Sequence, residues 1–112
     1  MSASDTVFSS ICPDEYKQAL QSRLEKTRAL VISTSVCPAC TRAKNLLERN
    51  NIDFTEVVLD RIRPEDADGV SKCVFGNSSK RFVPQVYLDQ KKLDNGLGDL
   101  MDMQRKNQLK TQ

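Results

Sequence analysis

Two cysteines separated by two residues form the part of this sequence best suited to chemistry. The motif Cys-Pro-Ala-Cys occupies positions 37–40, directly after the apolar run 29–32 and before the helix-like stretch 41–49. A strand that feeds a helix here places Cys37 at the helix N-terminus, where unpaired N–H groups and the helix dipole stabilise a thiolate. Such a thiol can have a pKa well below the ~8.5 of free cysteine and act as a nucleophile. Cys40, one turn on, can close a disulfide with Cys37, so the motif indicates a redox site.

The other two cysteines are expected to take no part in this chemistry. Cys73 lies in a weakly helical stretch and is expected to be a buried or idle thiol, whereas Cys12 is expected to be inert in a loose tail. An exposed Cys12 could still be glutathionylated or pair with another chain. A zinc site using all four cysteines is disfavoured, because zinc ribbons need two close pairs and these residues supply no second one. The absence of histidine also disfavours a metalloenzyme or a Cys-His hydrolase, and we expect no metal.

Length and charge fit one small domain. The 112 residues carry 17 basic and 15 acidic side chains, a net charge of +2, and these charges are interleaved rather than clustered. Nucleic acid is therefore not an expected partner. No apolar run approaches the ~18–20 residues of a membrane span, and the N-terminus lacks the basic start of a secretory signal. We expect a flexible tail over 1–12, one domain over 13–112 and a cytoplasmic location, with a mitochondrial one as the alternative.

The elements around the motif are read from apolar spacing and from helix-starting or helix-ending residues. They are a helix from Pro13, a strand over 29–32, a helix over 41–49, a strand over 54–59, a weaker helix from Pro64 that Gly69 and Gly76 interrupt or stop, a strand over 83–88, a short strand around 92–93 and a helix from about Asp99. The first strands need crossover connections and the last pair forms a hairpin. This order predicts an α/β fold with a four-stranded mixed sheet and helices on both faces.

A proline opens the third predicted strand, at Val83-Pro84. Proline cannot donate to a strand ladder, so this position alone indicates an edge or a turn. Together with the element order and the cysteine motif, however, it resembles the thioredoxin fold, in which this proline is cis and faces the redox-active cysteines. The resemblance implies that the backbone N–H and C=O of Val83 are exposed to substrate.

From about position 29 to 103 the chain resembles a dithiol glutaredoxin. The stretches that carry this resemblance are Val-Ile-Ser at 31–33, Cys-Pro-Ala-Cys at 37–40, Arg-Ala-Lys-Asn-Leu-Leu at 42–47, Arg-Phe-Val-Pro-Gln-Val-Tyr-Leu at 81–88 and Gly-Asp-Leu at 98–100. The resemblance implies that Cys37 attacks a glutathionylated or disulfide substrate, and that glutathione or Cys40 resolves the mixed disulfide.

The same resemblance implies a glutathione site. Arg81 would pair with the glycine carboxylate, with Lys80 adding positive charge there. Val83, beside Pro84, would hold the cysteinyl part through its backbone. Gly98 and Asp99, at a helix start, would bind the γ-glutamyl end.

The chain departs from the family pattern in three places. Thr34 stands where most relatives have a lysine, which removes a cation and one glutathione contact. Ala39 replaces the usual Tyr or Phe and leaves the site more open. The stretch from Asp94 to Gly98 replaces the paired glycines expected before the last helix. These departures predict a lower glutathione affinity than in typical relatives.

The resemblance implies a glutathione-dependent thiol–disulfide oxidoreductase, expected as a monomer, acting on glutathionylated proteins and small disulfides. Two alternatives remain open. Some glutaredoxins hold a [2Fe–2S] cluster between two chains through the nucleophilic cysteine and two glutathiones; Ala39 leaves room for one, whereas Pro38 disfavours it. The other alternative is a redoxin reduced by a thioredoxin-reductase-type partner.

Overall fold

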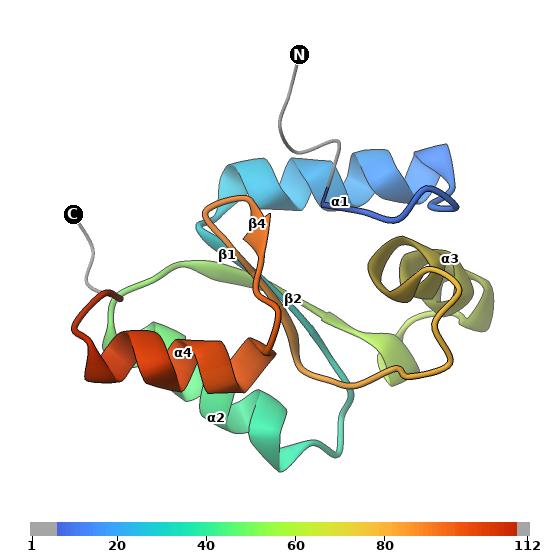
Figure 1. Cartoon of the computed structure of the whole chain (residues 1–112). Helices are drawn as coiled ribbons and strands as arrows, with labels where there is room; N and C mark the ends of the chain where they lie inside the picture. Colours follow the sequence, from blue (N-terminus) through green and yellow to red (C-terminus); the bar gives the residue numbers. More distant parts are fainter. Residues whose placement is uncertain (1–6, 110–112) are drawn as a thin grey trace.

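The computed structural model describes residues 7–109 and contains a four-stranded sheet with helices on both sides (Figure 1). In chain order the elements are α1 (Asp14–Lys26), β1 (Ala29–Ser33), α2 (Pro38–Arg49), β2 (Phe54–Val58), the 3-10 turn η2 (Leu59–Arg61), α3 (Pro64–Phe75), β3 (Gln85–Leu88), β4 (Lys91–Lys92) and α4 (Gly96–Arg105). This is the predicted element order, and the mixed α/β architecture is confirmed. None of the helices within residues 7–109 is long and apolar enough to cross a membrane.

The sheet has the strand order β2-β1-β3-β4. β1 pairs in parallel with β2, and α2 forms the crossover between them. β1 pairs antiparallel with β3, with Ile32 opposite Gln85, and β3 continues through a tight turn into β4. Because β1 runs toward the cysteine motif while β3 runs away from Pro84, this register brings the end of β1 and the start of β3 to the same edge of the sheet.

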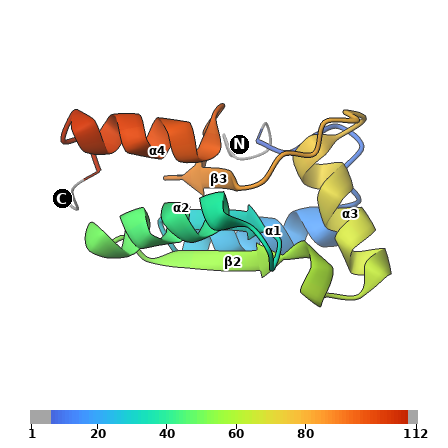
Figure 2. The ribbon, with the colours of Figure 1, turned by 90° about the horizontal axis from the view of Figure 1, so that it is seen from below.

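The two faces of the sheet bury different helices. Leu30 and Ile32 of β1 lie in a core cluster with residues of α1 and α3, whereas Ala29 and Val31 lie in a second cluster with residues of α2 and α4. The strand is buried throughout, as expected for a central strand that is covered on both sides. Figure 2 shows α2 and α4 running alongside each other on one face, with α1 on the other. The result is a three-layer packing, with α1 and α3 on one face of the sheet and α2 and α4 on the other.

The N-terminal segment differs from the expectation of a loose tail over 1–12. Residues 1–6 lie outside the described part of the chain, but within 7–12 Phe8 is only 6% exposed and its ring lies 5.4 Å from that of Tyr87. Cys12 forms a disulfide with Cys73 of α3, across 61 residues of sequence. The prediction that Cys12 is inert in a loose tail was therefore wrong, and Cys73 is buried, as expected, but is not an idle thiol. The prediction failed because nothing in local spacing shows that this segment packs against α3.

The predicted interruption of α3 at Gly69 and the predicted start of α4 near Asp99 were wrong, whereas α3 stops at Gly76 as predicted. α3 continues through Gly69 because the absent side chain leaves room for the ring of Tyr16; a Cβ there would lie 2.2 Å from a ring carbon. The helix ends at Gly76, which has a φ of 62° that glycine adopts easily. α4 begins at Gly96 rather than near Asp99, with Asn95 as the N-cap residue.

Candidate active site

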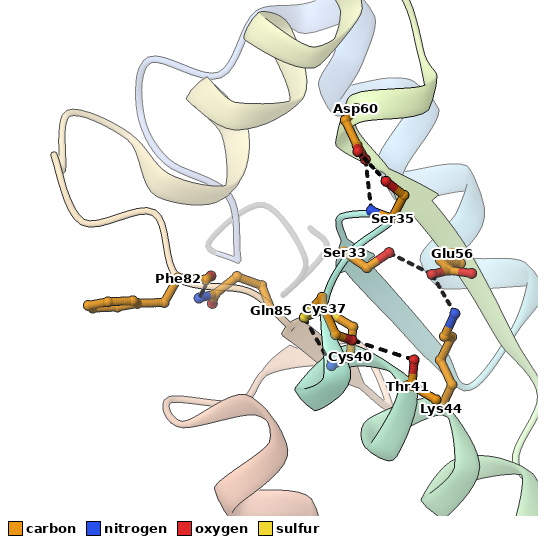
Figure 3. The surroundings of a disulfide bond; sticks show 10 residues. All are labelled: Ser33, Ser35, Cys37, Cys40, Thr41, Lys44, Glu56, Asp60, Phe82 and Gln85. Carbon is orange, nitrogen blue, oxygen red and sulfur yellow. Dashed lines mark hydrogen bonds and ion pairs between the residues drawn. A yellow bond between two sulfur atoms is a disulfide. The ribbon is translucent and has the colours of Figure 1, made fainter.

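Cys37 and Cys40 form a disulfide at the N-terminus of α2 (Figure 3). Cys37 is the N-cap residue, and its Sγ accepts a hydrogen bond from the backbone N–H of Cys40 at 3.1 Å. Cys40 is buried, with 1% of its surface exposed, whereas Cys37 is partly exposed. In the reduced form the same N–H can stabilise a thiolate on Cys37. The arrangement therefore suits an accessible attacking thiol and a shielded second thiol.

The loop before Cys37 is tied to the start of the 3-10 turn. Asp60 accepts hydrogen bonds from the backbone N–H of Ser35, at 2.9 Å, and from its hydroxyl. These bonds hold the pKa of the Asp60 carboxyl below its usual range. Thr34 lies half-buried in the same loop, three residues before the partly exposed Cys37. The path of the chain into the cysteine motif is thus held by the carboxylate of Asp60 in η2, the turn that follows β2.

A polar network joins β1, β2 and α2 beside the disulfide (Figure 3). The buried Ser33 hydroxyl donates to Glu56 Oε2 at 2.6 Å, and Lys44 Nζ lies 2.9 Å from the same oxygen. Burial raises the pKa of Glu56, but the hydrogen bond from Ser33 and the attraction of Lys44 outweigh it, so the pKa is lowered overall. Lys44, which follows Cys40 by one helical turn, is therefore paired rather than simply solvated.

The Val83–Pro84 peptide bond is cis, as the resemblance to the thioredoxin fold implied. Pro84 is buried, and it directly precedes Gln85, which pairs with Ile32 at the end of β1. The side-chain amide of Gln85 donates to the Phe82 carbonyl at 2.7 Å and so holds the chain before the proline. In Figure 3 Gln85 lies next to the disulfide, while the Phe82 ring points away from it.

The N-terminus of α4 closely approaches this proline. A Cβ at Gly96 would lie 2.4 Å from the Pro84 carbonyl oxygen, and Gly96 has a φ of 43°. Only glycine fits both conditions without strain. The contact places the first turn of α4 against the segment that carries Val83. Gly96 was not among the residues predicted for the site, although glycine at an expected helix start was an available signal.

The predicted glutathione residues fall into two groups. Lys80 and Arg81 are exposed on the loop between α3 and β3, and within residues 7–109 neither forms an ion pair. Gly98 and Asp99 lie in the first turn of α4, where both already have partners. The Gly98 N–H donates to the Asn95 carbonyl at 2.8 Å, and Asp99 Oδ2 accepts from the Asn95 N–H at 2.9 Å.

The four cysteines are divided between two disulfides, Cys12–Cys73 and Cys37–Cys40. Among the described residues no group of three or more His, Cys, Asp or Glu side chains is placed to hold a metal ion. The site that these residues build is a dithiol–disulfide centre at a helix N-terminus.

Comparison with known proteins agrees with this geometry. Residues 29–93, more than half of the chain, match the family model named Glutaredoxin. Over 80 residues the chain is 30% identical to a glutaredoxin of Pseudomonas aeruginosa, covering 71% of this chain and 88% of the relative. It is 25% identical to glutaredoxin 1 of Rickettsia prowazekii over 80 residues, covering 71% and 80% of the two chains.

Solved structures show the same fold. Oxidized glutaredoxin 2 of Chlamydomonas reinhardtii superposes with a TM-score of 0.68 at 26% identity, covering 86% of this chain and 88% of the other. A buckwheat glutaredoxin in complex with glutathione superposes with a TM-score of 0.71 at 23% identity, covering 86% and 84%. Sequence, fold and the cysteine pair at the start of α2 thus agree: this chain belongs to the glutaredoxin family of thiol–disulfide oxidoreductases.

Proposed function

We propose that this protein uses glutathione to reduce protein–glutathione mixed disulfides and small disulfides through Cys37 and Cys40. The observation that carries the proposal is the partly exposed Cys37 at the N-terminus of α2, at the sheet edge where the Val83–Pro84 segment also lies. A buried Cys40 behind it can resolve a disulfide but is poorly placed to meet a large substrate.

The reaction proceeds by two thiol–disulfide exchanges. The Cys37 thiolate attacks the glutathionyl sulfur of the substrate; the substrate thiolate leaves and takes up a proton, and Cys37 becomes bonded to glutathione. A second glutathione thiolate then attacks that glutathionyl sulfur, which releases the Cys37 thiolate and oxidised glutathione. Alternatively, the Cys40 thiolate attacks Cys37, releases glutathione and leaves the Cys37–Cys40 disulfide, which two further glutathiones reduce.

Glutathione would bind along the Val83–Pro84 segment. Arg81 supplies a guanidinium fork for the glycine carboxylate, with Lys80 beside it, and Val83 offers its backbone to the cysteinyl part. At the γ-glutamyl end the Gly98 N–H and the Asp99 carboxylate are already engaged within the helix start. The amides of Gly96 and of its neighbour at position 97 are therefore better candidates to meet the γ-glutamyl carboxylate. The buckwheat glutaredoxin described as a glutathione complex supports this class of ligand.

The test is turnover of a glutathionylated peptide with glutathione as the reductant. Cys37→Ser should abolish turnover, because it removes the attacking sulfur, whereas Cys40→Ser should only reduce it, because glutathione can still resolve the mixed disulfide. The same assay with a thioredoxin-reductase system in place of glutathione separates the two classes of reductant. Turnover that survives Cys37→Ser, or that requires the thioredoxin-reductase system, would overturn the proposal. The monomeric state and cytoplasmic location remain predictions.

A further inference from the structure

The segment before α1, residues 7–12, is anchored to α3 by several independent contacts. Cys12 is bonded to Cys73, the Ser9 N–H donates to the Cys73 carbonyl at 2.9 Å, and the Ser9 hydroxyl donates to the Lys72 carbonyl. Phe8 then reaches over to the sheet, where it packs against Tyr87 of β3. The segment therefore touches both α3 and β3.

These two elements hold the ends of the loop that carries the predicted glutathione residues. The loop leaves α3 at Gly76, three residues after Cys73, and enters β3 at Gln85, two residues before Tyr87. Position 76 also meets the segment, since a Cβ there would lie 3.2 Å from Ser9 Cβ. Residues 77–82 are themselves exposed. Their position thus depends on how firmly the two ends of the loop are held.

We propose that Cys12 and Cys73 form a second redox site, separate from Cys37–Cys40, which small thiols such as glutathione open and which controls the position of the loop carrying Lys80 and Arg81. The effect on the loop rests on the proposed function, because it assumes that this loop binds glutathione. The exchange chemistry at Cys12–Cys73 does not.

Exposure decides which sulfur exchanges. Both cysteines are buried, but Cys12, which is 9% exposed and follows the exposed Ile11, is more accessible than Cys73, which is 0% exposed. A glutathione thiolate therefore attacks Cys12, forming a Cys12–glutathione disulfide while the Cys73 thiolate leaves and takes up a proton. A second glutathione thiolate attacks the glutathionyl sulfur, yielding the Cys12 thiol and oxidised glutathione. One disulfide is reduced, and two glutathiones are oxidised to one disulfide.

The exchange is tested first in a Cys37→Ser/Cys40→Ser variant, in which only Cys12 and Cys73 remain. The folded variant is equilibrated with mixtures of reduced and oxidised glutathione, alkylated and weighed by mass spectrometry. We expect the Cys12–Cys73 disulfide to open in a cooperative step while circular dichroism still reports a folded protein. A disulfide that opens only when the protein unfolds would overturn the proposal. This measurement needs no activity, so it stands even if the glutathione-dependent function is wrong.

The effect on the loop is tested with Cys12→Ala in the protein that retains Cys37 and Cys40. We expect the KM for glutathione to rise about fivefold, the lower end of typical coupling between sites, with kcat changed less than twofold. Hydrogen exchange at residues 77–82 should rise while β1 stays protected. Phe8→Ala, which keeps the disulfide, should give a smaller rise in exchange, and the exposed Ser10→Ala serves as the matched control. Unchanged exchange at 77–82 in Cys12→Ala would overturn the control of the loop.

Discussion

At the scale of single residues, the position three residues before the nucleophile is the clearest departure from the family pattern. Thr34 lies half-buried in the loop that Asp60 holds through Ser35. Its side chain carries no charge, so the Cys37 thiolate depends on the helix N-terminus, including the Cys40 N–H that already points at Cys37 Sγ. A cation at position 34 would add a second source of stabilisation.

Thr34→Lys is therefore expected to lower the pKa of the Cys37 thiol and to raise activity at neutral pH. An exposed ion pair contributes about 0.5–1 kcal/mol, which corresponds to an activity about two- to fivefold higher. Thiolate absorbance, followed across pH in the reduced protein, measures the titration directly. Gln18→Lys adds the same charge on the exposed side of α1 and serves as the control. An unchanged thiolate titration in Thr34→Lys would contradict the prediction.

At the scale of elements, the active site depends on the packing of the start of α4 against β3. Gly96 permits this packing because it has a φ of 43° and because a Cβ there would lie only 2.4 Å from the Pro84 carbonyl oxygen, which leaves no room for a side chain. Gly98, two residues later, meets only the flexible side chain of Asn95, at 3.1 Å. Of these two glycines in one helical turn, only Gly96 lies where a side chain would clash with the backbone.

Gly96→Ala is expected to lower the free energy of unfolding by about 1–3 kcal/mol, because it combines backbone strain with overpacking against a carbonyl. It should also raise the KM for glutathione, since α4 would move away from the segment that carries Val83. Urea unfolding measures the first effect, and steady-state kinetics measure the second. Gly98→Ala should be destabilised by much less; equal losses in the two variants would show that the contact with Pro84 is unimportant.

At the scale of the whole molecule, the lowered pKa of Glu56 links stability to pH. Its pKa is lowered on folding, against the opposing effect of burial, by Ser33 and Lys44. A carboxyl whose pKa is lower in the folded state stabilises that state above its unfolded pKa of about 4.3. This stabilisation is lost as the pH falls through the folded pKa. The Glu56 network therefore favours the fold at neutral pH and ceases to do so in acid.

We expect Glu56→Gln to lower the free energy of unfolding at pH 7 by about 1 kcal/mol, the scale of a partly exposed network of this kind. The difference from the unsubstituted protein should shrink below about pH 4, where Glu56 begins to be protonated. Denaturant unfolding at a series of pH values measures both. Glu48→Gln, on the exposed face of α2, is the control. A difference that stayed constant with pH would mean that the charge of Glu56 does not matter.

Much of the architecture was predictable because it depends on short-range patterns. The buried strand at 29–32, the helix after the cysteine motif and the hairpin of the last two strands follow from apolar spacing and turn residues. Among the helices and strands, the errors lie at element boundaries. α3 passes through Gly69 because Tyr16, from another helix, occupies the space beside it. No local signal reveals such a contact, so the sequence pattern indicated an interruption there.

The sequence by itself determined the Cys37–Cys40 pair, because its two cysteines are joined by one helical turn whose geometry is local. The sequence also showed that Pro84 is unusual at the start of a strand, and the family resemblance predicted the cis bond before it. The roles predicted for Arg81, Lys80 and Val83 remain predictions. Only the tertiary structure decided that Cys12 meets Cys73, because 61 residues separate them and their contact exists only once the N-terminal segment packs on α3.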